Sequence, residues 1–209
     1  MVNVKEYLEL FITQSKLTDK LNNLQLPDIY LEQDKIKVLM INEVTPLNPE
    51  DFFYSSMDKP DYMKTTLPLF HNAGIHVDSI QDIINKGIYI TTAVKCPKTG
   101  YSVERNVIET HAVILEEEIH LFPNLKVIML MGDVAKKAFN MIAKKNIKKN
   151  VIPSEATYKI RKNQYFYGDI RVFPSYIMTG GNILIEKSKV SMITEDIREM
   201  ADVTGIALE

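Results

Sequence analysis

The side chains best able to do chemistry lie directly after short apolar runs that are typical of strands. There are four such runs: Lys35–Asn42, Gly87–Val94, Leu125–Gly132 and Asp169–Ser175. The first three are nearly continuous apolar stretches with β-branched residues, as in strands of a parallel sheet that is covered on both faces. Ligands of open parallel sheets bind beyond the carboxyl ends of the strands. The residues after each run are therefore the predicted site.

The segment after the first run offers a carboxylate and aromatic rings. Glu43 can act as a general base, or it can accept hydrogen bonds from a base edge or from backbone amides. An ion pair or a loop-capping role is the alternative for Glu43. Phe53, in the trio Phe52–Tyr54, can stack on a flat ligand. Burial of the trio in a loop is the alternative there.

The segment after the second run carries two lysines. Lys95 and Lys98 can contact phosphate, and a solvated loop is the alternative. Cys96 lies between them and is the only cysteine of the chain. A lone cysteine without a partner motif favours a buried thiol over a reactive one.

The last two segments contain glycines and hydroxyl groups. Gly132 joins the third run to a helical pattern, and such a junction can offer backbone amides to a phosphate. The chain lacks the Gly-x-Gly-x-x-Gly and Gly-Lys-Ser/Thr fingerprints, so nucleotide-cofactor binding is not supported. Ser175 and Tyr176 follow the fourth run, and the pair Gly180–Gly181 gives a flexible turn.

Several classes of site are excluded by residue type and spacing. The four histidines form no His-x-x-x-His pair, and no Gly-x-Ser-x-Gly motif is present. One cysteine excludes an intrachain disulfide and an all-cysteine metal centre. We therefore expect neither a metal site nor a serine hydrolase.

Composition indicates an ordinary globular domain. The 209 residues carry 25 Lys plus Arg against 27 Asp plus Glu, and 45% of them are hydrophobic. We expect one domain over residues 1–209, with residues 1–30 as an N-terminal helical extension. No apolar run is long enough for a membrane helix, and the start is not a signal peptide. With the single thiol, these features favour the cytoplasm.

Helical patterns separate the four strand-like runs. Strands that alternate with helices predict βαβ units and a three-layer α/β/α fold. Residues 144–167 are irregular and suggest a surface excursion with a small hairpin around residues 158–167. The predicted helices are Val4–Ser15, Tyr62–Ala73, Ser79–Asn85, Glu104–Phe122, Asp133–Lys145 and Ser188–Val203.

The strand-end motifs resemble those of the uracil-DNA glycosylase superfamily, in particular its small bacterial and archaeal iron–sulfur group. The match covers roughly residues 35–203. Residues 42–46 (NEVTP) are similar to the group's Gly-Glu-Ala-Pro-Gly motif, and residues 89–97 (YITTAVKCP) to its Tyr-Val-Thr-Asn-Val-Val-Lys-Cys-Arg-Pro motif. Residues 115–119 and 127–135 are similar to its helix, third strand and Gly-x-x-Ala turn, and residues 172–176 (VFPSY) to its His-Pro-Ser-Tyr motif.

The resemblance implies a four-stranded parallel sheet in the order 2-1-3-4 and a base-excision site at the strand ends. In the family a flipped nucleotide enters this pocket, an aromatic ring stacks on the base, an amide reads its edge and a His supports the departing base. Glu43 matches the family's Glu, Thr92 lies where the family has its base-reading Asn, and Phe173 lies where it has its His. Only Cys96 matches a cluster cysteine, so we expect no iron–sulfur cluster and no other cofactor.

Two readings of function follow from these substitutions. The first is a DNA N-glycosylase of altered specificity, with Glu43 and Thr92 as catalytic residues. The second is a non-catalytic module that binds nucleic acid or a nucleotide, or an interaction protein. A small-molecule α/β hydrolase is the third hypothesis and ranks last, because the chain lacks the motifs of such enzymes. The expected ligand-binding residues are Asn42, Phe53, Phe173, Ser175 and Tyr176, and the expected DNA contacts are Lys95, Lys98, Gly132 and Lys136.

The partner that these readings imply is DNA, a nucleobase or a nucleotide, and we expect a monomer. The near-neutral charge argues against a generally basic nucleic-acid coat. A local cluster of lysines after the third run can form a DNA-facing edge, or equally a solvated helix. The cluster consists of Lys136, Lys137, Lys144, Lys145, Lys148 and Lys149.

Overall fold

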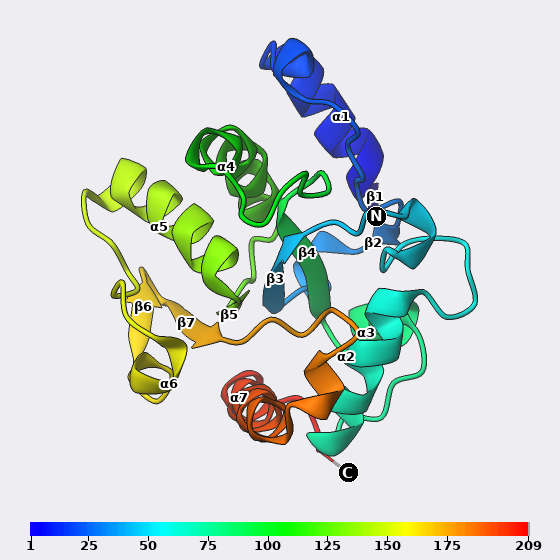
Figure 1. Cartoon of the computed structure of the whole chain (residues 1–209), viewed down its shortest axis with the longest axis vertical. Coiled ribbons are helices and arrows are strands. Elements are labelled where there is room, and N and C mark those ends of the chain that lie inside the picture. The colour runs from blue at the N-terminus through cyan, green and yellow to red at the C-terminus, as the bar shows by residue number, and fades with distance from the viewer. Residues whose placement is uncertain (209) are drawn as a thin grey trace.

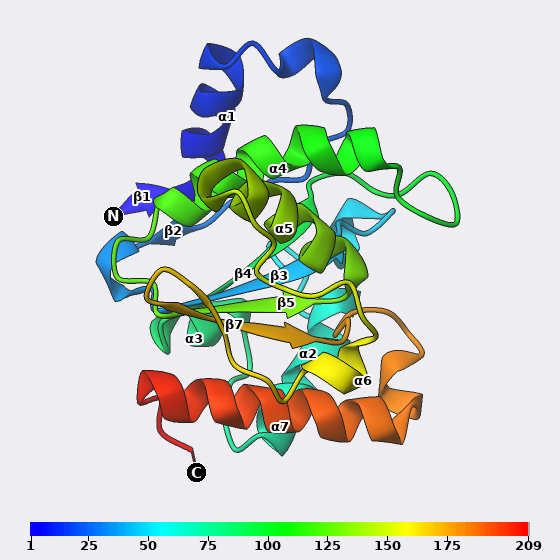
Figure 2. The same cartoon turned by 90° about the vertical axis from the view of Figure 1, so that its left-hand side faces the viewer.

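A central sheet with helices on both faces organises the chain. The computed structural model describes residues 1–208. In Figures 1 and 2, helices α4 (Arg105–His120) and α5 (Asp133–Ile147) cover one face of the sheet, and helices α2 (Asp61–Asn72), α3 (Ile80–Asn85) and α7 (Lys187–Thr204) cover the other. The predicted mixed α/β architecture with a mostly parallel sheet is therefore confirmed.

The sheet has five strands in the order β4-β3-β5-β7-β6. Strands β3 (Val38–Val44), β4 (Ile88–Val94), β5 (Val127–Met131) and β7 (Ile170–Ser175) run parallel. The fifth strand, β6 (Tyr165–Tyr167), pairs antiparallel with β7.

The sheet thus has one strand more than predicted. Part of the expected surface excursion, residues 144–167, joins the sheet edge through β6. The turn that leads from β6 into β7 is formed by Gly168 and Asp169, and the φ angle of Gly168 is +59°. The strand consists of three consecutive aromatic residues, a residue type that favours strand structure.

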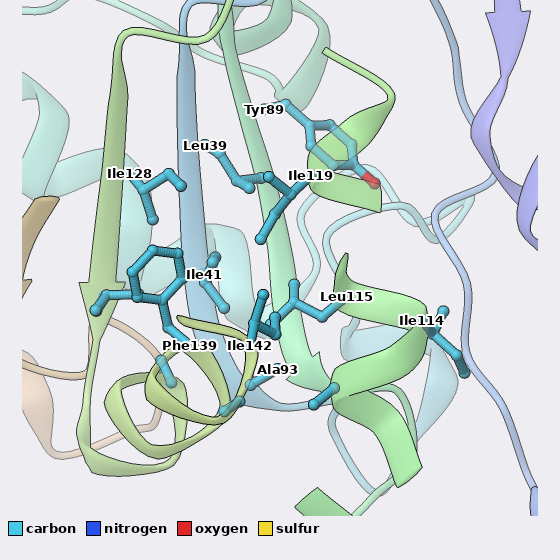
Figure 3. Close-up of a cluster of buried hydrophobic side chains, with 14 of the residues drawn as sticks. Leu39, Ile41, Tyr89, Ala93, Ile114, Leu115, Ile119, Ile128, Phe139 and Ile142 are labelled. Carbon is cyan, nitrogen blue, oxygen red and sulfur yellow. The ribbon is translucent and has the colours of Figure 1, made fainter. Parts of the chain in front are cut away.

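Burial on both faces explains why the parallel strands are continuously apolar. Every residue of β4 and β5 is buried. Successive side chains of a strand point to opposite faces. Leu39 and Ile41 of β3 therefore pack under α4 and α5, together with Leu115 and Phe139 (Figure 3), whereas Met40 packs toward α2 and α7.

Helix α1 (Val4–Gln14) lies outside this three-layer body and packs on α4, on the side away from the sheet (Figure 2). Asn3 caps the helix by accepting a hydrogen bond from the Glu6 amide at 3.0 Å. The Tyr7 hydroxyl donates to Glu117 of α4. Two short strands, β1 (Val2–Asn3) and β2 (Tyr30–Leu31), pair antiparallel beside it.

Short helical turns complete the fold. Helix α6 (Thr157–Ile160) precedes β6, and single 3-10 turns occur at Thr18–Lys20, Gln33–Lys35, Pro49–Asp51 and Ile183–Ile185. No helix within residues 1–208 is long and apolar enough to cross a membrane.

The junction between β5 and α5 requires glycine. Gly132 has a φ angle of +108°, and a Cβ atom built there would lie 2.5 Å from Glu43 Oε1. An L side chain is therefore opposed by its own backbone conformation and by the neighbouring carboxylate.

Substitution Gly132→Ala should lower the free energy of unfolding by about 1–3 kcal/mol. Urea denaturation monitored by circular dichroism measures this change. Gly181→Ala is the matched control, because Gly181 has no positive φ angle and its Cβ would meet nothing within 4 Å. Equal stability of the two variants would contradict the steric argument.

Candidate functional site

A cleft of about 780 Å³ opens at the carboxyl ends of β3, β5 and β7. The start of α5 forms one wall, and the segment 150–158 forms another. Three of the charged lining residues are acidic and five are basic. They are Glu43, Asp133 and Glu155, and Arg105, Lys136, Lys137, Lys144 and Lys189.

Glu43 lies at the base of the cleft and binds the start of α5. Its Oε1 accepts a hydrogen bond from the Val134 amide at 3.0 Å. A carboxylate is favourable at a helix N-terminus, because the free amides there carry partial positive charge. This contact agrees with the capping role that was the alternative to catalysis for Glu43. The carboxylate also occupies an amide that a phosphate at Gly132 would need.

The lysines of the cleft fall into two kinds. The Lys136 amine lies 2.7 Å from Asp133 Oδ1 and donates to Thr157 Oγ1 at 2.9 Å, so it joins α5 to α6. Lys137 and Lys144 are exposed, and neither has a carboxylate partner within residues 1–208. These two amines are therefore the cations best placed to receive an external anion.

The structure divides the predicted site residues between two places. Glu43, Gly132, Lys136, Ser175 and Tyr176 line the cleft. The other expected pocket residues do not line it and are at most 1% exposed: Asn42, Phe53, Thr92 and Phe173.

Strand alternation is the physical reason for this division. Asn42 and Glu43 are neighbours on β3, so their side chains point to opposite faces of the sheet. Asn42 follows Met40 toward the α2 and α7 side, whereas Glu43 points toward α5. A single pocket formed by all the predicted residues is therefore not present in this structure.

Of the three predicted aromatic residues, Tyr176 lines the cleft, whereas Phe53 and Phe173 do not. Phe53 packs against Phe52 and Tyr62, with ring centroids 6.0 and 5.1 Å away. The Arg171 guanidinium lies 4.4 Å from the ring centroid of Phe173. Both rings are thus occupied by protein neighbours and offer no open face to a base.

Asn42 and Thr92 lie side by side on β3 and β4 without hydrogen-bond partners for their side chains. They are paired in the strand register. Neither the amide of Asn42 nor the hydroxyl of Thr92 has a partner within residues 1–208. A buried unpaired polar group costs about 1–3 kcal/mol of folding free energy. These two polar side chains therefore do not stabilise the fold.

Lys95 is buried, contrary to the expected phosphate contact. Its amine contacts Glu118 Oε2 and donates to Thr91 Oγ1 at 2.6 Å and to the Thr92 carbonyl at 2.7 Å. Glu118 also accepts a hydrogen bond from Tyr89. Burial lowers the pKa of Lys95, and Glu118 opposes this effect.

All three protons of the Lys95 amine are used inside the protein. No proton of this amine remains for a DNA phosphate. Lys98 is exposed but does not line the cleft.

Ser175 uses its hydroxyl inside the protein as well. Its Oγ donates to Asp196 Oδ2 at 2.6 Å, and Arg161 Nη2 binds Asp196 Oδ1 at 2.7 Å. Burial raises the pKa of Asp196 to about 6, against the opposing effect of these hydrogen bonds. No pattern in the sequence predicts this network, because Arg161 and Asp196 are far apart along the chain.

Cys96 and His111 form a neutral pair. The Lys95 amide donates to His111 Nδ1 at 3.2 Å, which leaves the ring proton on Nε2, 3.4 Å from Cys96 Sγ. Burial lowers the pKa of His111 to about 4, with a smaller effect of the Lys95 charge, and burial raises the pKa of Cys96. Because His111 cannot accept the thiol proton, the pair is not an activated nucleophile.

Within residues 1–208, no group of three or more His, Cys, Asp or Glu side chains is arranged to hold a metal ion. The wall residue Tyr158 was not singled out by sequence reasoning. It belongs to the irregular segment that had no predicted contact with the strand ends, so only the folded chain places it in the cleft.

Comparison with known proteins finds no protein-family model that matches the chain and no curated protein that matches it. These two comparisons therefore add no support to the resemblance to uracil-DNA glycosylases.

Two neighbouring threonines should respond oppositely to the isosteric change to valine. Thr92→Val removes an unpaired hydroxyl and should leave stability unchanged or raise it by up to about 1 kcal/mol. Thr91→Val removes a hydroxyl that contacts both Lys95 and Glu118 and should cost about 1–3 kcal/mol. Urea denaturation of both variants tests this contrast, and a clear loss of stability in Thr92→Val would contradict it.

The buried His111 should make stability depend on pH. Its pKa is depressed when folded, so His111 contributes a loss of stability as pH falls from 6.5 toward about 4, whereas Asp196, whose pKa is raised, contributes in the opposite direction in every variant. The loss should reach roughly 3 kcal/mol, and His111→Gln should remove it. Unfolding curves from pH 7 to 4 measure the slope. The exposed His76→Gln should retain the wild-type slope, and an unchanged slope in His111→Gln would refute the assignment.

Proposed function

We propose that the chain is a protein related to the uracil-DNA glycosylase superfamily that binds DNA phosphates in the cleft without excising bases. The observation that carries this proposal is the cationic cleft at the carboxyl ends of the parallel strands. It contains two exposed lysines, Lys137 and Lys144, that have no carboxylate partner within residues 1–208. Lysines that receive phosphates position a nucleic acid without reading its sequence.

The arrangement of the parallel strands supports the relationship to the superfamily. Along the sheet they follow the order β4-β3-β5-β7, in which the second parallel strand of the chain lies beside the first. This is the order that the resemblance implies. The single cysteine suits a reducing compartment, so we place the protein in the cytoplasm.

The residues at the family's chemical positions favour binding over excision. Phe173 cannot donate a hydrogen bond to a departing base, and one such donor is worth roughly 3–4 kcal/mol in a transition state. Thr92 is fully buried away from the cleft. Glu43 is engaged with the Val134 amide.

Base excision remains the second candidate function because of one observation. The unpaired amide of Asn42 and hydroxyl of Thr92 lie together at the carboxyl ends of β3 and β4. Such a pair of donors and acceptors is suited to the edge of a base. Both side chains are 0% exposed, so a base would reach them only after a rearrangement of the residues that cover them.

Reversal of charge in the cleft should weaken DNA binding. For a fluorescein-labelled oligonucleotide at about 0.1 M salt, Lys137→Glu/Lys144→Glu should lower affinity at least about tenfold. It should also reduce the slope of log affinity against log salt by about 1.5–2, because two phosphate contacts are lost. Fluorescence anisotropy over a salt series measures both quantities.

A matched double variant separates the cleft from net charge. Lys37→Glu/Lys126→Glu makes the same change in charge at exposed positions next to the amino ends of β3 and β5, the opposite edge of the sheet. It should bind almost as wild type does. Equal losses in the two double variants would mean that binding is not located in the cleft, and no binding by wild type would refute the proposal.

A single-turnover cleavage assay tests the second candidate. Excess protein is incubated with oligonucleotides that carry uracil, hypoxanthine or xanthine, followed by alkali to break abasic sites. We expect no cleavage above the control without protein. Cleavage that is lost in Glu43→Gln would instead establish an N-glycosylase.

A further inference from the structure

We propose that the cleft receives an unpaired DNA strand and that one of its bases stacks on Tyr158. This inference rests on the proposed function, because it specifies the form of DNA and a residue that binds it. Tyr158 lies in α6, lines the cleft and is 63% exposed. Stacking on aromatic rings is the general way in which proteins hold single-stranded nucleic acid.

Tyr158 differs from Phe53 and Phe173, the two buried rings of the predicted pocket. Phe53 and Phe173 are each 1% exposed and packed against protein neighbours. The amine of Lys159 lies over the ring of Tyr158 at 5.9 Å from the centroid, farther than Arg171 lies from Phe173, and the ring stays 63% exposed. A base on this ring would therefore have a positive charge close to its phosphate.

The segment that carries Tyr158 is firmly held. Thr157 accepts a hydrogen bond from Lys136 of α5 at 2.9 Å. On the other side, Arg161 donates to the Met192 carbonyl at 2.6 Å and pairs with Asp196 of α7 at 2.7 Å. Ile160 is buried between these anchors at 2% exposure. A platform fixed in this way loses little conformational freedom when a base stacks on it.

The cations that accompany the platform lie along α5. Lys137 and Lys144 both line the cleft. They are separated by two helical turns, or about 10 Å along the helix axis at 1.5 Å per residue. The cleft thus combines lysines that can contact the phosphate backbone with an aromatic ring on which a base can stack. This combination is typical of proteins that bind single strands.

The size of the cleft suits an unpaired strand better than a duplex. A cavity of about 780 Å³ is within the range of sites for one small ligand. Reading of a duplex needs an element that projects into a groove, and the major groove is about 12 Å wide. The lysines and Tyr158 line a concave surface. A base can reach the ring of Tyr158 only when it is unpaired.

The test compares a fluorescein-labelled 12-nucleotide single strand with its duplex by anisotropy. Tyr158→Ala should weaken single-strand binding by about 5- to 150-fold, whereas Tyr158→Phe should stay within about twofold of wild type. Tyr101→Ala is the matched control, because Tyr101 is fully exposed but does not line the cleft. The duplex should bind more weakly than the single strand.

The outcomes separate this inference from the proposed function. If wild type binds neither form of DNA, the proposed function fails. If it binds DNA but prefers the duplex, or if Tyr158→Ala binds the single strand as wild type does, then this inference is wrong and phosphate binding in the cleft stands. Circular dichroism of Tyr158→Ala confirms that the fold is retained, as expected for a side chain exposed to solvent.

Discussion

The buried ion pair between Lys95 and Glu118 is the interaction on which the arrangement of β4 and α4 depends. Both side chains are fully buried, so each charge must be matched within the protein. Thr91 and Tyr89 supply the remaining hydrogen bonds of the carboxylate. Removal of one partner of such a pair costs about 3–5 kcal/mol. The lysine that follows β4 therefore serves the fold, and the cations available to a ligand come from α5.

The site is shaped by the alternation of side chains on β3. Glu43 points to α5 and neutralises part of the positive end of that helix, whereas Asn42 points into the opposite layer. The cleft consequently has the charge needed to hold phosphates but lacks the amide that would read a base. Glu43 and Asn42, which the family resemblance places in one pocket, therefore lie on different faces of this sheet.

The segment before β6 completes the cleft. Arg161 and Asp196 join it to α7, and Lys136 joins it to α5. These contacts convert a polar stretch without a core of its own into a rigid wall that presents Tyr158. The cleft therefore depends on two polar links between parts of the chain that are distant in sequence.

The sequence by itself determined the layers of the fold. Continuous apolar runs identify strands that are buried on both faces, and apolar residues at helical spacing identify the helices that pack on the sheet. Both patterns report local burial. The cluster of lysines after β5 was likewise predicted from the sequence. Alternation along a strand already separates Asn42 from Glu43. Only the tertiary structure decided the burial of Lys95 and the placement of Tyr158 in the cleft. These outcomes depend on partners distant in sequence, such as Glu118, and on the direction of single side chains, which composition and spacing do not encode.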